Sequence, residues 1–141
     1  MTRPSPWDQM KAAGAEGIAL QGDIRDPSFC RLVVDETIDT WGRIDILVNN
    51  ASVQYPQNDL SMIKEEQLVQ TFSVNVFGMF YLKQAALKYM KKGSCIINTT
   101  SVTAFRGSGH QVDYAATKGA IVGFIRSLAL QLAKKGGNIM A

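Results

Sequence analysis

The sequence predicts an α/β fold, in which a parallel sheet packs against helices. Two observations support it. Short apolar runs alternate with longer segments whose apolar residues recur at helical spacing, in the order strand, helix, strand, helix, strand, helix. The chain has 141 residues, of which 46% are hydrophobic and 19% charged, so it is long enough to bury one core. We therefore expect a single domain of layered strands and helices.

The first two expected elements are a short strand and the helix that follows it. The strand is GIALQGD, residues 17–23. Asp26 can cap the next helix, and Pro27 suits its first position, where a backbone N–H has no partner in any case. An apolar face continues to Trp41, and Gly42 is expected to end the helix.

The remaining elements alternate in the same way. A second strand is expected at 43–50, where an almost continuous apolar run suggests that both faces are covered. The helical pattern over 64–91 is long for one globular helix, so a bend is expected at 75–78. A third strand at 94–100 and a last helix at 112–135 complete the order.

Charge and apolar content exclude several classes of protein. The net charge is +3, and the basic residues are scattered except for the pairs Lys91-Lys92 and Lys134-Lys135. We expect both pairs at helix ends, where cations suit the helix dipole, so nucleic acid is not an expected partner. No apolar run approaches the length of a membrane span, and the first residues lack an apolar secretion segment, so the expected location is the cytoplasm.

The two cysteines point to packing rather than chemistry. Cys30 and Cys95 lie far apart, outside any CxxC motif and without a nearby histidine. We therefore expect neither a disulfide framework nor a metal site, and treat both as small buried hydrophobic residues.

The stretch DYAATKG suggests proton-transfer chemistry. It places Tyr114 and Lys118 on one face of the last helix, just after a loop that leaves the carboxyl end of a strand, where parallel sheets bind ligands. A phenol titrates at about 10, and a cation one helical turn away lowers that value. Ser101 could hydrogen-bond a carbonyl that Tyr114 protonates. A Tyr-x-x-x-Lys pair alone is weak evidence, because exposed helices also contain it by chance.

Five motifs in order are more specific than any one of them. They are Asp23 after a strand, Asn49-Asn50-Ala51 after ILV, Asn75 in NVFG, Ser101 in INTTS, and Tyr114 with Lys118 in YAATKG. Together, over roughly residues 17–135, they resemble the short-chain dehydrogenase/reductase family, and look most similar to a bacterial branch of general-stress and glucose-dehydrogenase-like oxidoreductases.

The resemblance implies hydride transfer between NAD or NADP and an alcohol or carbonyl substrate. In that family pattern Tyr114 is the general acid and base, and Lys118 lowers its pKa and holds the nicotinamide ribose. Ser101 orients the carbonyl, and Asn75 places a water that links Lys118 to solvent. The pattern gives His110, the only histidine, no role.

The resemblance also implies cofactor-binding positions. Asp23 and Ile24 would lie against the adenine, and Asn50 and Ala51 would line the cofactor beside Tyr114 and Lys118. Taken singly, each motif residue also has a structural explanation: a loop serine, an asparagine at a helix bend, or an aspartate at a strand end.

Two departures from the family pattern matter. Ser52 replaces a glycine that usually follows Asn-Asn-Ala, and its side chain crowds a segment close to the cofactor. No strand-GxxxGxG-helix unit precedes residue 17, so we expect a partial Rossmann-like doubly wound parallel sheet that lacks the first βαβ unit and the C-terminal strands. Two absent strands would leave about 14 Å between strands 17–23 and 43–50, and would leave Asp23 unanchored relative to strand 43–50.

Two functions therefore stay open. One is an oxidoreductase whose substrate and NAD or NADP preference are undetermined. The other is an inactive member of the family that acts only by oligomerisation or partner binding, through helices at about 64–91 and 112–135. Retention of the motif residues favours the first, and the missing glycine turn favours the second.

Overall fold

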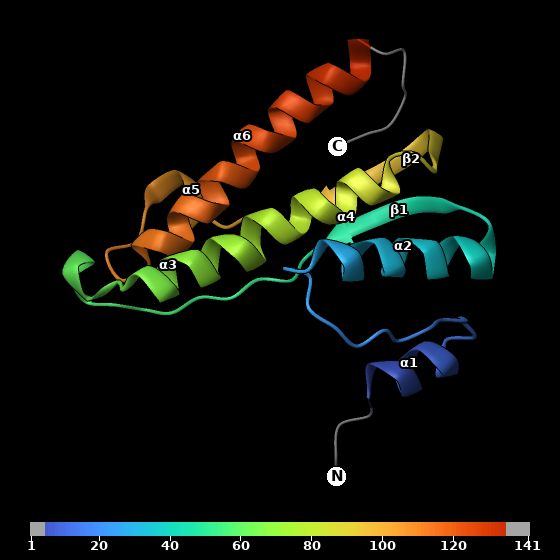
Figure 1. Ribbon diagram of the computed structural model, residues 1–141, viewed down its shortest axis with the longest axis horizontal. Helices are drawn as coiled ribbons and strands as arrows, with labels where there is room; N and C mark the ends of the chain where they lie inside the picture. Colours follow the sequence, from blue (N-terminus) through green and yellow to red (C-terminus); the bar gives the residue numbers. More distant parts are fainter. Residues whose placement is uncertain (1–4, 135–141) are drawn as a thin grey trace.

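The computed structural model describes residues 5–134, which form a small parallel sheet and several helices (Figure 1). In chain order the elements are α1 (Pro6–Ala12), α2 (Pro27–Trp41), β1 (Ile44–Asn49), the 3₁₀ helix η1 (Leu60–Met62), α3 (Glu65–Phe72), the π-helix η2 (Ser73–Phe77), α4 (Gly78–Ala86), β2 (Met90–Asn98), α5 (Thr103–Arg106) and α6 (Val112–Lys134). The predicted α/β class with a parallel sheet is confirmed.

Helix α2 begins and ends where its capping residues predict. The Asp26 side chain accepts a hydrogen bond from the Ser28 N–H, and Pro27 is the first helical residue. Gly42 adopts a left-handed conformation with φ of 72°, and its N–H closes the last turn on the Ile38 carbonyl. Glycine is favoured there because a Cβ would strain this backbone conformation.

The sheet has two parallel strands among the described residues. Register pairs join Leu47 to Ile96 and Val48 to Ile97, with a shift between Ile44 and Ile46. The expected strand at 17–23 is wrong, because no strand lies beside it to accept and donate backbone hydrogen bonds. That segment is irregular, and its Ile18 and Leu20 side chains are exposed.

One face of the sheet carries the core, and the other is open. The core cluster joins α2, α4 and α6 to the sheet through Val34, Ile44, Ala85, Ala86, Met90, Ile96 and Leu128. On the opposite face Ile46, Val48 and Ile97 are 61%, 55% and 48% exposed. Coverage of both faces, expected from the apolar run, is therefore wrong for the described residues. Cys30 is buried as expected, whereas Cys95 is only half-buried.

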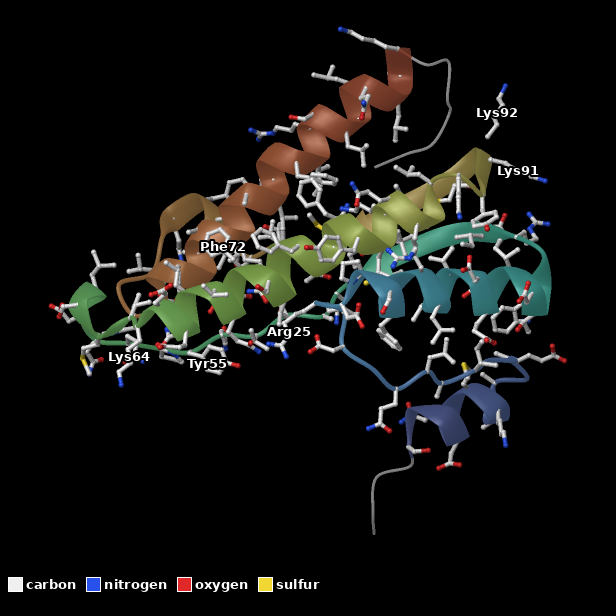
Figure 2. All side chains as sticks on the ribbon, viewed as in Figure 1. Arg25, Tyr55, Lys64, Phe72, Lys91 and Lys92 are labelled. Atoms are coloured by element: carbon white, nitrogen blue, oxygen red, sulfur yellow. The ribbon has the colours of Figure 1, made fainter. Side chains whose placement is uncertain are left out.

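The helical segment after residue 64 changes to a π-helix where a bend was predicted, and it ends earlier than predicted. Helices α3, η2 and α4 form one continuous rod (Figure 1), in which the π-helix spans Ser73–Phe77. The rod ends at Ala86, because the chain enters β2 at Met90, where it pairs with Ile44. Lys91 and Lys92 therefore lie in the strand, exposed at its outer end (Figure 2), and their expected place at a helix end is wrong. Lys134 ends α6, and Lys135 lies outside the described residues.

Candidate functional site

The predicted site residues converge at the carboxyl end of the two strands. The chain leaves β1 and β2 side by side, and the Thr99 N–H donates to the Asn49 carbonyl at 3.0 Å. The Thr99 hydroxyl donates to Asn50 Oδ1 at 2.9 Å, and Asn49 Nδ2 donates to Asn98 Oδ1 at 3.2 Å. Both strands thus deliver polar residues to the edge where parallel sheets bind ligands.

A cavity of about 50 Å³ lies at this edge. Five of the predicted site residues line it: Ile24, Asn50, Ala51, Asn75 and Lys118. The other lining residues are Val48, Asn49, Met79, Leu82, Thr99 and Ile121. Asp23, Ser101 and Tyr114 do not line it.

Lys118 is the cation of the site and is nearly inaccessible. Its side chain extends from α6 to the end of β2, where Nζ donates to the Thr99 carbonyl at 3.0 Å. The residue is 2% exposed, and this burial lowers the pKa of its ammonium below the ordinary lysine value. Nζ lies 5.4 Å from the centre of the Tyr114 ring, so the predicted pairing on one face of the helix is confirmed.

Ser101 has a local partner in this chain. Its hydroxyl accepts a hydrogen bond from the Thr103 N–H at 3.2 Å, and lies 3.1 Å from the Thr103 hydroxyl, at the start of α5. These contacts fit the structural explanation of a loop serine, in which the side chain supports a helix start.

Asn75 lies inside the π-helix and holds the loop that follows β1. Its Oδ1 accepts from the Val53 N–H at 2.8 Å, and its Nδ2 donates to the Val53 carbonyl at 2.9 Å. Nδ2 also donates to the Thr117 hydroxyl at 3.0 Å. Both amide protons are therefore used, so a water bound by this side chain would have to donate to Oδ1. Single π-turns often occur at functional sites.

The segment 23–25 is anchored by the helical rod, although it has no strand partner. Arg25 donates to the Asp23 carboxylate through Nε at 2.8 Å and Nη2 at 2.5 Å, and this hydrogen bonding lowers the pKa of Asp23. Arg25 also donates to Gln70 of α3, and extends from its segment toward the rod (Figure 2). Ile24 lines the same cavity as Val48 and Asn49 of β1, so the expectation that this segment would be unanchored relative to strand 43–50 is wrong.

Ile24 provides a second anchor on the same rod. A Cβ at Gly78 would lie 2.9 Å from the Ile24 carbonyl oxygen and from its Cγ1 and Cδ1 atoms. Only glycine lets the segment approach α4 this closely. The rod thus holds this segment, although no strand lies beside it within the described residues.

Sequence reasoning missed three buried polar residues next to Tyr114. Asp113 accepts from the Thr71 hydroxyl, and the Thr117 hydroxyl donates to the Tyr114 carbonyl. All three are under 4% exposed. Helical spacing could have indicated them. Asp113 and Thr117 are four residues apart, as are Thr71 and Asn75, so each pair lies on one face of its helix.

Comparison with known proteins identifies the family. A family model described as short chain dehydrogenase matches residues 5–141. The chain belongs to this family. Within residues 5–134 no helix is both long and apolar enough to cross a membrane, and no cluster of His, Cys, Asp or Glu could hold a metal ion.

Curated relatives of this chain include plant and bacterial proteins. It is 51% identical over 121 residues to NADPH-dependent aldehyde reductase 1, chloroplastic, of Arabidopsis thaliana, with 86% of this chain and 42% of the relative covered. It is 41% identical over 133 residues to General stress protein 39 of Bacillus subtilis, with 94% and 46% covered. The chain thus spans under half the length of these relatives.

Solved structures of similar fold include proteins with nicotinamide cofactors bound. A short chain dehydrogenase/reductase of Burkholderia phymatum in complex with NAD superposes with a TM-score of 0.88 at 26% identity, covering 94% of this chain and 48% of that one. A short chain dehydrogenase of Burkholderia cenocepacia in complex with NADP gives 0.86 at 32% identity, covering 93% and 53%. The Rossmann-like character of the fold is thereby confirmed.

Proposed function

We propose that residues 1–141 form one partial NAD(P)-binding Rossmann-like domain that carries the proton-transfer residues of an oxidoreductase. Its substrate is an alcohol or carbonyl compound, and its cofactor is NAD or NADP. The observation that carries the proposal is the placement of Lys118, buried at the carboxyl end of both strands and 5.4 Å from the Tyr114 ring.

The residues at the cavity suit a nicotinamide cofactor. Asn49 lines the cavity, and its Oδ1 is buried without a hydrogen-bond partner among residues 5–134. A buried acceptor of this kind calls for a donor from a ligand or water. Asn50 and Ala51 lie beside it, Lys118 would hold the nicotinamide ribose, and Asp23 and Ile24 would meet the adenine.

The chain's own residues would move the proton. The nicotinamide, when bound, supplies or accepts the hydride. Tyr114 gives its phenolic proton to the oxygen of a carbonyl substrate, and takes it back from the alcohol in the reverse direction. Lys118 stabilises the phenolate that remains, Ser101 orients the carbonyl, and Asn75 holds a water that resupplies the proton.

The hydroxyl of Tyr114 tests this function. Tyr114→Phe keeps the ring but removes the proton donor, so reductase turnover by this chain, or by a longer protein that contains it, should fall by about 10²-fold or more. Circular dichroism should show an unchanged fold. Turnover at the wild-type rate in Tyr114→Phe would refute the assignment.

A second candidate function is oligomerisation without catalysis, and a specific surface favours it. Two apolar grooves run along the rod and α6, one beside Phe80 and Phe124 and the other beside Val69 and Phe77. Val69 is 55% and Phe77 45% exposed, and exposed apolar patches of this kind mark interaction sites. A homo-oligomer would bury both grooves.

Analytical sedimentation tests this second function. It should show an oligomer that Phe77→Glu dissociates, whereas a wild-type monomer at high concentration would rule out oligomerisation.

A further inference from the structure

The backbone of Tyr114 is held at both of its polar groups by side chains. Its N–H donates to Asp113 Oδ1 at 2.9 Å, and its carbonyl accepts from the Thr117 hydroxyl at 2.7 Å. Tyr114 lies in the first turn of α6, where backbone N–H groups have no acceptor within the helix. Asp113 supplies that missing acceptor.

The two side chains that hold Tyr114 are themselves held by the helical rod. Asp113 Oδ2 accepts from Thr71 Oγ1 at 2.8 Å and from Gln67 Nε2 at 3.1 Å. Thr117 Oγ1 accepts from Asn75 Nδ2 at 3.0 Å. Two polar bridges, Thr71–Asp113 and Asn75–Thr117, therefore cross between the rod and α6 one helical turn apart. We call these four residues the polar ladder.

The polar ladder is buried, and its hydrogen bonds therefore constrain how α6 is rotated against the rod. Thr71 and Thr117 are 0% exposed, Asn75 is 2% and Asp113 is 3%. Apolar side chains could join two helices as firmly, but they would tolerate small rotations of one helix against the other. Breaking a buried hydrogen bond costs free energy, because the separated polar groups have no water to bind. The ladder therefore fixes the rotation of α6 about its axis. That rotation sets the direction in which Tyr114 and Lys118 point.

We propose that Asp113 and Thr71 are positioning residues that fix the Tyr114 ring relative to Lys118 through this ladder. The inference rests on the proposed role of Tyr114 as the acid and base. Functional side chains need support of this kind, because small losses of alignment reduce the rate of a positioned proton transfer. Gln67 extends the same support to the loop after β1, since it also donates to the Tyr55 carbonyl at 3.0 Å.

The test follows the Tyr114 ring and amide directly, without a need for turnover. The chain is labelled with 3-fluorotyrosine, and the Tyr114 signal is assigned by its absence in Tyr114→Phe. In Thr71→Val and in Asp113→Asn, we expect this signal to shift or broaden, and the amides of residues 113–117 to exchange about 10-fold faster or more. Thr71→Ser keeps the hydroxyl, and should restore both readouts.

Thr37→Val is the matched control. Thr37 donates to the carbonyl four residues before it at 2.7 Å, and the Thr71 hydroxyl lies 2.8 Å from the corresponding carbonyl, but within residues 5–134 Thr37 makes no bridge to another helix. Its substitution should leave the Tyr114 signal unchanged. An unchanged Tyr114 signal in both Thr71→Val and Asp113→Asn would overturn the ladder. Wild-type turnover in Tyr114→Phe would instead overturn the proposed function, and leave the ladder intact, so the two failures are distinguishable.

Discussion

Lys83 on α4 is buried, although it has no role in the proposed function. It is 1% exposed, its Nζ has no hydrogen-bond partner among the described residues, and Nζ lies 4.1 Å from the centre of the Phe124 ring. Burial lowers the pKa of this ammonium to about 7. The Phe124 face offsets part of the cost of burying a cation, but not all of it.

The pH dependence of stability follows from this shift. Between about 7 and the unfolded lysine value of about 10.4, the unfolded chain binds more protons at Lys83 than the folded chain, so stability should rise with pH. Lys83→Met removes the buried charge, and should stabilise the protein by about 1–3 kcal/mol at pH 6–7 while flattening that rise. Urea unfolding at pH 6, 8 and 9.5 measures the difference between the two proteins.

The control for this prediction lies on the same segment. Lys88 is exposed, so Lys88→Met should leave the pH dependence of the free energy of unfolding as in the wild type. A difference between wild type and Lys83→Met that does not change from pH 6 to 9.5 would contradict the assignment.

At the scale of elements, the rod of α3, η2 and α4 organises the site. It fixes segment 23–25 through Gln70 and Gly78, the loop after β1 through Asn75, and α6 through Thr71. The π-helix lies at its centre and contains Asn75, whose side chain contacts both the loop after β1 and α6.

Gly78→Ala tests the close contact between Ile24 and this rod. Glycine to alanine within a helix ordinarily stabilises by about 0.5–1 kcal/mol. Here the new Cβ would lie 2.9 Å from the Ile24 carbonyl oxygen, so we expect a loss of about 1–3 kcal/mol as the segment is displaced. Chemical denaturation measures the sign of the change.

Gly119→Ala is the matched comparison, because a Cβ there meets nothing within 4 Å. It should show the ordinary gain in stability. A gain of the same size in Gly78→Ala would mean that segment 23–25 moves aside at no cost, and that the close contact does not hold it.

At the scale of the whole molecule, the two-stranded sheet leaves one apolar face and both strand edges without a protein partner among the described residues. Exposed edges and apolar faces favour association. Within residues 5–134 no GxxxGxG turn opens a helix, so the pattern that binds a pyrophosphate through backbone N–H groups is not found there.

We therefore expect the 141-residue chain, purified alone, to bind NADH and NADPH weakly or not at all, and to self-associate. Lys118 and Asn50 would supply part of a cofactor site, but a GxxxGxG turn that would bind the two phosphate charges is not found within residues 5–134. Calorimetric titration with both cofactors, together with light scattering, measures both properties. Micromolar binding by a monodisperse sample would show that another part of the chain provides the phosphate site.

The sequence alone determined the local features of this protein. Capping by Asp26 and termination at Gly42 were predictable, because they depend on single residues and their immediate neighbours. The placement of Tyr114 and Lys118 on one face of α6 followed from helical spacing. The ordered motifs also identified the family, since each records one local chemical requirement.

Tertiary structure decided what depends on distant partners. An apolar run at 17–23 forms a strand only if another strand pairs with it, and none does within the described residues. Anchoring of Asp23 through Arg25 and Gln70 joins residues 45 positions apart, and the bridge from Thr71 to Asp113 joins residues 42 apart. Residue patterns predict neither the strand pairing nor these hydrogen bonds, because both depend on which surfaces meet after the chain has folded.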